Sequence, residues 1–443
     1  MKFLMSRWVM MLGVALVIVA GSMVLAPAVA KQVAPQAAGN GSAVLGGGSA
    51  PVGVGNGYTD RLVADMQRRA AADPRDSLAL SQLGLGYLQK ARETNDPSYY
   101  TKAEEALDKA LALKPGDYDS TAAMGSLELS RHQFSKALEW GTKARGLNPN
   151  KGYAYGVMGD AQIELGKYDE AVNTFQKMVD LHPDLSSYSR VSYARELYGD
   201  LAGAIEAMQQ AVDAGSPAAE NTAWVRVQLG NLYFNSGRLE SAEREYNHAL
   251  YAYPGYLHAT AGLAQVRAAQ GRVDEAIKLY KASIAGVPLP QYVVALGDLY
   301  ASKGDTASAK EQYDLVLFTY RLFEVNGVNA DIEKAAFLAD QDQDAEQAVK
   351  LAQEAAKGRQ DVHTLDTLAW SLYRVGRYGE ALAAEKNAMH LGTQNAMFYF
   401  HAGMIYSKLG DQDNARANLQ KALKINPHFS VKYAPQAMEE LGK

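Results

Sequence analysis

The sequence has no cysteine among its 443 residues and a net charge of only −5. The absence of cysteine excludes disulfide bonds, zinc sites with thiolate ligands, cysteine nucleophiles and a lipid-modified cysteine near the N-terminus. A chain without an excess of basic residues has no electrostatic footprint for nucleic acid, so we expect no nucleic-acid partner. The apolar fraction of 48% is ordinary for a folded protein and too high for a disordered one.

The sequence also lacks the common catalytic and metal-binding motifs. None of its eight histidines belongs to a His-x3-His pair, and neither HExxH nor GxSxG occurs. We interpret His363 and Asp366 as surface or groove residues, and we expect a protein that is not an enzyme and needs no cofactor or metal. The alternative is a hydrolase or transferase whose site is hidden in a groove and includes His258, Asp298 and Asp366.

The N-terminus has the layout of an export signal. Residues 1–30 place Lys2 and Arg7 near an apolar run that ends before Ala28-Val29-Ala30, which predicts a signal peptide cleaved after Ala30. The apolar run just reaches membrane-spanning length, so an uncleaved membrane anchor is the alternative. Residues 31–57 contain almost no charge and many Gly, Ala, Val and Pro, which predicts a flexible linker. The remainder is expected outside the cytoplasm, in the periplasm or cell envelope or secreted.

Residues 152–183 show the pattern that the rest of the chain repeats. Two segments of helical periodicity are separated by Gly166, and Pro183 closes the second. The small residues Gly159, on the first predicted helix, and Ala171, on the second, suggest a packing in which the two backbones approach closely. Phe175 would then fill the space above them. The apolar faces of the two predicted helices carry Tyr155, Met158, Gly159 and Gln162, and then Tyr168, Ala171, Phe175 and Met178.

This pattern resembles the tetratricopeptide repeat, whose signature W-x2-L-G-x2-Y…A-x3-F…P occupies about 34 residues. Leu229-Gly230-x2-Tyr233, Ala242-x3-Tyr246 and Pro254 fit it, whereas the initial tryptophan is mostly replaced. The C-terminal part resembles the closing repeats of exported or envelope-associated bacterial members of this family. The resemblance implies an all-α, right-handed solenoid of helical hairpins that binds a protein or peptide in its concave groove.

One small residue at the start of each second helix predicts about ten repeats. We expect an N-terminal array with a lead-in helix over 58–325 and a C-terminal array with a capping helix over 326–443. The capping helix should turn Met438 and Leu441 inward. The ten small residues are Ala103, Ala137, Ala171, Ala204, Ala242, Ala276, Ala309, Ala348, Ala381 and Ala415.

The segment Tyr313–Phe323 predicts a helix that is apolar on nearly all sides. Two interpretations stay open: the helix packs between the two arrays, or it forms an exposed patch for a partner or for self-association. The second would make the protein a structural, self-assembling component of the envelope.

The resemblance also implies which residues line the concave groove. Aromatic, amide and charged side chains there would suit an extended peptide or a partner helix. The Lys/Asn/Arg set with which some family members clamp a terminal carboxylate is absent from the first repeats, which disfavours a receptor of that kind. The groove positions are Tyr153, Asp160, Arg190, Tyr193, Trp224, Gln228, Asn231, His258, Gln265, Gln291 and Asp298.

Overall fold

A computed structural model describes residues 57–217 and 219–442, and within these residues the chain forms twenty-two α-helices and no strand. The predicted signal peptide or anchor and nearly all of the predicted linker lie outside the described residues. In the described part, no helix combines the length and the apolar character that a membrane crossing requires.

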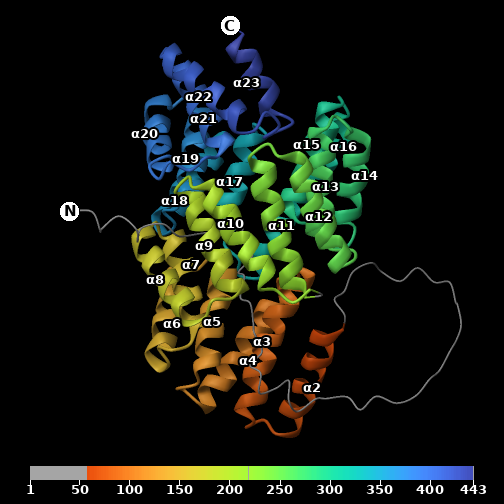
Figure 1. Cartoon of the computed structure of the whole chain (residues 1–443), viewed down its shortest axis with the longest axis vertical. Helices are drawn as coiled ribbons and strands as arrows, with labels where there is room; N and C mark the ends of the chain where they lie inside the picture. The colour runs from red at the N-terminus through yellow and green to blue at the C-terminus, as the bar shows by residue number, and fades with distance from the viewer. Residues whose placement is uncertain (1–56, 218, 443) are drawn as a thin grey trace, which may run out of the picture.

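Ten antiparallel helical hairpins lie between the lead-in helix α2 (Tyr58–Ala72) and the closing helix α23 (Tyr433–Leu441) (Figure 1). We number the hairpins 1 to 10 in chain order. Hairpins 1 to 5 are α3 (Ser77–Thr94) with α4 (Ser98–Leu113), α5 (Tyr118–Ser130) with α6 (Phe134–Leu147), α7 (Gly152–Glu164) with α8 (Tyr168–Leu181), α9 (Leu185–Leu197) with α10 (Leu201–Asp213), and α11 (Glu220–Asn235) with α12 (Leu239–Ala252). Hairpins 6 to 10 are α13 (Leu257–Ala269) with α14 (Val273–Ile284), α15 (Pro290–Ser302) with α16 (Thr306–Val325), α17 (Asp331–Asp340) with α18 (Ala345–Gly358), α19 (Val362–Arg374) with α20 (Tyr378–Ala388), and α21 (Ala396–Lys408) with α22 (Gln412–Ile425).

The packing inside each hairpin follows the predicted pattern. All ten alanines that mark the repeats are buried. In hairpin 3, Phe175 fills the space over Gly159 so closely that a Cβ on this glycine would lie 2.3 Å from the ring. The fold is therefore the expected right-handed α-solenoid, in which each hairpin buries its apolar face against its neighbours.

The long helix α16 has one buried and one exposed face. Val316 and Tyr320 belong to a hydrophobic cluster that runs from α15 to α23, so the core continues across the predicted array boundary at residues 325/326. On the other face, Phe318, Leu322 and Val325 are 48%, 44% and 83% exposed. Each of the two interpretations of this helix thus describes a different face: one face packs in the core, and the other is an exposed apolar patch.

The closing helix α23 differs from the prediction in its orientation. Met438 is 55% exposed rather than turned inward, whereas Leu441 packs against the core. The buried face consists of Tyr433, Ala434 and Ala437, because the tyrosine provides the large apolar surface that hairpin 10 requires.

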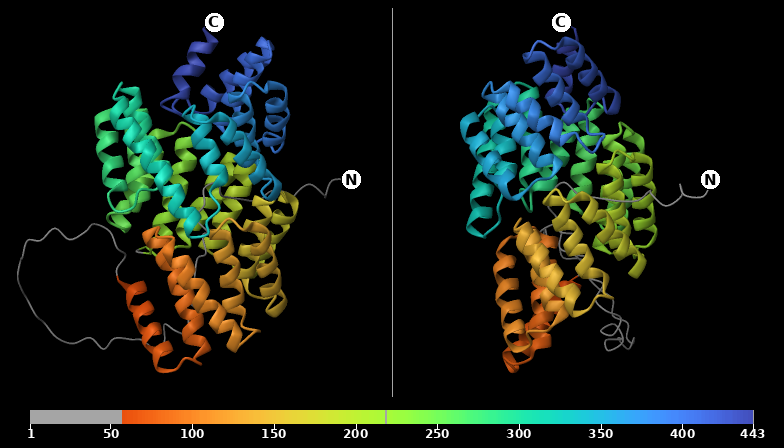
Figure 2. Two further views of the ribbon diagram at one scale, coloured as in Figure 1. Left: turned by 180° about the vertical axis from the view of Figure 1, so that it is seen from behind. Right: turned by 90° about the vertical axis from the view of Figure 1, so that its left-hand side faces the viewer.

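The solenoid makes contact with itself after one superhelical turn. The C-terminal helices stack on the hairpins of the first half (Figures 1 and 2). Hydrogen bonds join residues 192 to 198 positions apart, which is close to six repeats of about 34 residues. The backbone amide of Gln360 donates to the carbonyl of Glu164 at 2.9 Å, and Thr393 Oγ1 donates to the carbonyl of Leu197 at 2.5 Å.

Glycines at the hairpin turns permit this stacking. Gly166 and Gly199 have φ angles of +72° and +76°, which residues with a side chain rarely adopt. A Cβ on Gly199 would also lie 2.5 Å from the carbonyl oxygen of Gly392 in the second turn. These turns therefore end a helix and bring two layers of the solenoid together at the same point.

Candidate functional site on the inner face of the solenoid

Several predicted groove residues join neighbouring first helices. Arg190 on α9 forms a two-pronged contact with Asp160 on α7, with nitrogen–oxygen distances of 2.8 and 2.6 Å. Burial raises the pKa of Asp160, and the arginine opposes that shift. The hydroxyl of Tyr153 lies 2.7 Å from Ser126 Oγ on α5. These contacts fix the relative position of successive hairpins.

Two more predicted residues are held in the same way on the following hairpins. His258 Nδ1 shares a hydrogen bond of 2.7 Å with the Tyr292 hydroxyl, and burial lowers the pKa of this histidine to about 4. Asp298 accepts hydrogen bonds from Tyr313 Oη at 2.7 Å and Gln341 Nε2 at 3.0 Å. Gln265 is half-buried on α13. The three residues of the alternative hydrolase site thus bond to different partners: His258 to Tyr292, Asp298 to Tyr313 and Gln341, and Asp366 to His401.

Four predicted residues meet around one cavity of about 310 Å³, which we name the amide cavity. Tyr193 comes from α9, and Trp224, Gln228 and Asn231 come from α11. The opposite wall belongs to the second turn of the solenoid. It carries the amide side chains of Gln394, Asn395 and Asn426.

The sequence could not assign these second-turn residues to the same place, because they lie about 200 positions beyond Tyr193 and Trp224 in the sequence. Glu196 also lines the amide cavity and was not predicted. Burial raises the pKa of its carboxyl to about 7. Among the described residues that line the cavity there is no lysine or arginine.

The eleventh predicted residue, Gln291, lines a second cavity of about 440 Å³. Its walls are mainly apolar and include Leu289, Tyr320, Phe323 and Phe337. His363 borders both cavities and has a pKa lowered by burial. The predicted groove residues thus border one amide-rich and one mainly apolar cavity.

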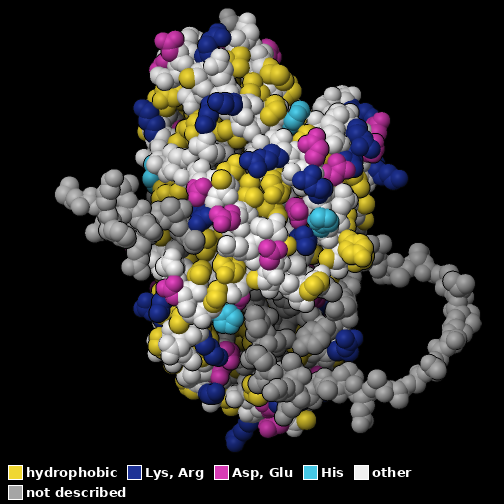
Figure 3. All heavy atoms as spheres, in the orientation of Figure 1, with side chains coloured by type: hydrophobic (Ala, Val, Ile, Leu, Met, Phe, Trp, Pro, Cys, Tyr) yellow, Lys and Arg dark blue, Asp and Glu magenta, His cyan; other side chains and the backbone are white. Residues whose placement is uncertain are grey.

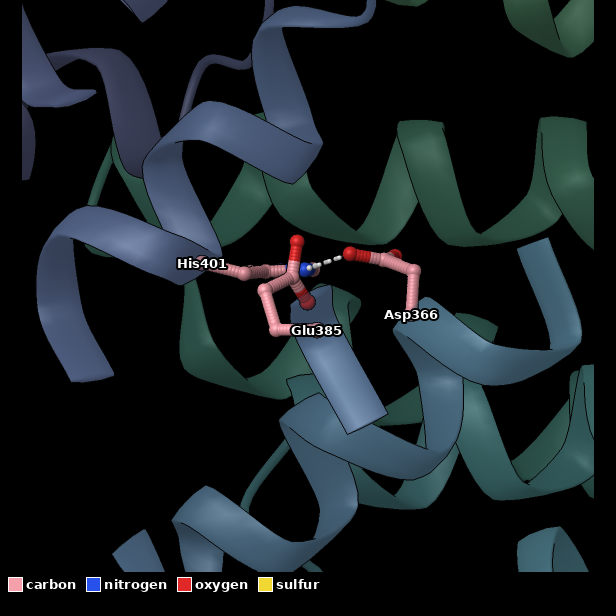
Figure 4. A group of neighbouring side chains, drawn as sticks. All are labelled: Asp366, Glu385 and His401. Carbon is pink, nitrogen blue, oxygen red and sulfur yellow. Dashed lines mark hydrogen bonds and ion pairs between the residues drawn. The ribbon is translucent and has the colours of Figure 1, made fainter. Parts of the chain in front are cut away.

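A buried polar cluster lies outside both cavities, between α19, α20 and α21 (Figure 4). Asp366 accepts a hydrogen bond of 2.8 Å from His401 Nδ1, and Glu385 lies beside them. Our interpretation of Asp366 as a surface or groove residue was wrong, since all three residues are buried. The replacement of the repeat's aromatic residue by Glu385 is the sequence signal that could have revealed the cluster.

One face of the molecule is of mixed character. On the face shown in Figure 3, basic and acidic side chains are interspersed, and hydrophobic side chains form small separate groups. This face offers no extended area of a single charge.

The fold and its inner face define an α-solenoid built from repeated helical hairpins. Models of a family described as tetratricopeptide repeat match residues 157–219, 227–289 and 397–429. These segments of the chain are tetratricopeptide repeats. Repeats of this family generally bind protein partners.

Similar proteins come from distant organisms. The chain is 29% identical over 97 residues to the mitochondrial import receptor subunit TOM70 of Rattus norvegicus, covering 22% of this chain and 16% of TOM70. It is 22% identical over 386 residues to a TPR repeat-containing protein of Methanocaldococcus jannaschii, covering 78% of this chain and 64% of that protein. The chain thus spans less than two thirds of either relative. Among solved structures, the human IFIT1 dimer with PPP-AAAA has a TM-score of 0.48 and 16% identity, covering 76% of this chain and 78% of that chain.

Proposed function

We propose that the protein is a non-catalytic scaffold that is exported across the cytoplasmic membrane and binds a protein or peptide partner at the amide cavity. The observation that carries this proposal is the convergence of Tyr193, Trp224, Gln228 and Asn231 with the amides of the second turn around one space.

The chemistry of the walls suits a peptide backbone. A side-chain amide both donates and accepts hydrogen bonds, and an extended peptide presents both kinds of group at every residue. Trp224 and Phe429 add apolar surface for a side chain of the partner. The volume of about 310 Å³ lies at the lower end of the range of ligand pockets, which favours a short segment.

Paired variants test the site. Gln228→Ala with Asn395→Ala removes one amide from each wall, while Gln209→Ala with Asn247→Ala removes the same groups from the exposed outer helices α10 and α12. In affinity capture from envelope extract, we expect the wild type and the outer-helix variant to recover the same partner. The cavity variant should recover at least tenfold less.

Equal recovery by the cavity variant would contradict binding at this place, and the absence of any specific partner would contradict the scaffold function. Export needs a separate test, because its support is the sequence of residues 1–30. A fusion of these residues to a phosphatase that is active only outside the cytoplasm should be active. An inactive fusion would contradict export.

The exposed face of α16 favours self-assembly as a second candidate function. Phe318, Leu322 and Val325 lie at steps of four and three, so they form one apolar stripe on the helix. Light scattering at increasing protein concentration tests it: an assembly that Leu322→Glu dissolves supports this function, and a monomer at high concentration removes it.

A further inference from the structure

Hairpin 9 departs from the rule that the other hairpins follow. The fourth residue after each marker alanine lies inside the hairpin, and it is Phe175 in hairpin 3, Tyr246 in hairpin 5 and Leu419 in hairpin 10. Of the ten hairpins, only hairpin 9 has a residue with a carboxyl group at this position, and that residue is Glu385. Glu385 is 1% exposed. A carboxyl group at the centre of a repeat is costly to bury unless something compensates its charge.

The neighbours of Glu385 are themselves metal-ligand types. Asp366 on α19, Glu385 on α20 and His401 on α21 each place one ligand atom within 4.8 Å of the other two. Figure 4 shows the three side chains pointing toward one another from three helices. All three residues are more than nine-tenths buried.

The cluster has unused bonding capacity. The carboxyl of Glu385 interacts with the carboxyl of Asp366, and no N–H group of the described residues donates to either of its oxygens. His401 Nε2 has no hydrogen-bond partner among the described residues. No lysine or arginine of the described part forms an ion pair with any of the three. Two carboxyl groups therefore share a buried space in which the only nearby base is one imidazole.

We propose that Asp366, Glu385 and His401 form a metal site that holds one first-row divalent ion, for which zinc is the best fit. A divalent cation would neutralise the two carboxylates and bind the Glu385 oxygens, which no basic side chain of the described residues pairs with. One imidazole and two carboxylates suit zinc, whereas calcium and magnesium prefer oxygen ligands alone. Tetrahedral geometry with bonds of about 2.1 Å places ligand atoms about 3.4 Å apart. Binding would therefore rearrange the present spacing, in which the ligand atoms lie within 4.8 Å of one another and His401 Nδ1 is hydrogen-bonded to Asp366.

The surroundings would hold the imidazole ligand in place. The ring of Trp370 stacks on that of His401 at 4.2 Å, and Trp370 Nε1 donates to Asp340 at 3.0 Å. Tyr433 from the closing helix donates to the same carboxylate at 2.8 Å. Groups that orient a ligand in this way raise metal affinity. The ion would join α19, α20 and α21, so its role is structural.

Titration with zinc alone tests the site. The protein is purified without a polyhistidine tag, treated with chelator and dialysed, and zinc is then added during calorimetry and thermal unfolding. We expect one zinc per chain and a midpoint of unfolding that rises by several degrees. Calcium should give neither effect.

Three variants on one helix make the result specific. Glu385→Gln keeps the shape and removes the charge, and Glu385→Phe restores the apolar residue of the other hairpins. Both should fold, bind zinc at least tenfold more weakly and lose the zinc-dependent rise in midpoint. Glu380→Gln alters an exposed carboxylate of α20 and should behave as the wild type.

Two results would overturn the proposal. One is zinc binding that Glu385→Phe leaves unchanged. The other is a wild type that takes up no zinc in calorimetry, whatever the stability of the Glu385 variants.

Discussion

Hairpins 3 and 9 share one backbone design but have opposite interiors. In hairpin 3, Phe175 lies in full van der Waals contact over Gly159. In hairpin 9, the equivalent position is Glu385, and Asp366 and His401 replace apolar contacts with polar ones. Because each hairpin depends on its neighbours, the solenoid tolerates a polar interior in one hairpin while the others supply the apolar burial.

This difference separates two kinds of residue in the repeat. The marker alanines, such as Ala171 and Ala381, are buried in both hairpins and set the distance between helices. The fourth residue after them determines what fills the space. Fold and local chemistry are therefore encoded at different positions of the same repeat, and substitutions can test them separately.

The largest expected effect comes from emptying the apolar interior. Phe175→Ala should lower the free energy of unfolding by about 3–5 kcal/mol, since it removes a fully buried ring and leaves a cavity. Denaturant unfolding followed by circular dichroism measures it. Glu385→Ala in metal-free protein is the matched control and should cost far less, because the loss of packing is offset by the removal of a buried carboxyl. Equal losses at both positions would contradict the comparison.

A buried histidine should make the stability of the fold depend on pH. His258 lies against the neutral Tyr292, and burial together with the positive charge of Arg92 lowers its pKa to about 4. The unfolded chain takes up this proton near pH 6.5, so the folded state loses stability as the pH falls below 6.5. The loss should approach about 3 kcal/mol at pH 4.

Denaturant unfolding between pH 7 and pH 4 measures this loss in the wild type and in His258→Gln. Other groups titrate in both proteins, so the difference between the two curves isolates His258. A His258→Gln protein that is as acid-sensitive as the wild type would show that the histidine is not the source of the effect.

The sequence predicted the parts of the fold that depend on near neighbours. Each contact between Ala171, Gly159 and Phe175 spans fewer than twenty positions, and such spacing is visible as helical periodicity. The resemblance to the tetratricopeptide repeat implied that Tyr193, Trp224, Gln228 and Asn231 lie on the inner face, and these four residues line one cavity. Whether they bind a partner stays a prediction.

The contacts between superhelical turns could not be predicted. They join residues nearly 200 positions apart, as Thr393 and Leu197 do, and which residues meet depends on the pitch of the whole solenoid. For the same reason the sequence did not reveal that Asn395 and Asn426 face Trp224. Orientation within α23 was missed because Met438 and Tyr433 are both apolar, and only the shape of hairpin 10 decides which is buried.

A smaller effect should follow from separating the two turns. Gly199→Ala adds a methyl group where the carbonyl oxygen of Gly392 lies 2.5 Å away and where φ is +76°. The backbone strain alone costs about 1–3 kcal/mol. Gly271→Ala is the control, because it has a similar φ of +75° but open space around the new methyl group.

Thermal unfolding of the two variants separates strain from contact. The midpoint should fall further for Gly199→Ala than for Gly271→Ala, and hydrogen exchange should rise in hairpins 9 and 10 only for the former. If the midpoint falls equally in both variants and hydrogen exchange rises in neither, the second turn does not depend on its contact with the first.

The smallest effect on stability is expected at the end of α16. Val325 is 83% exposed, so Val325→Ser removes little buried surface and should change the free energy of unfolding by about 0.5 kcal/mol or less. Val316 on the same helix is fully buried, and Val316→Ser should cost several times more because it buries an unsatisfied hydroxyl in the core. Denaturant unfolding of the two variants compares the faces of one helix directly. Equal losses would mean that the apolar stripe of α16 is covered in solution, which a self-assembled protein would require.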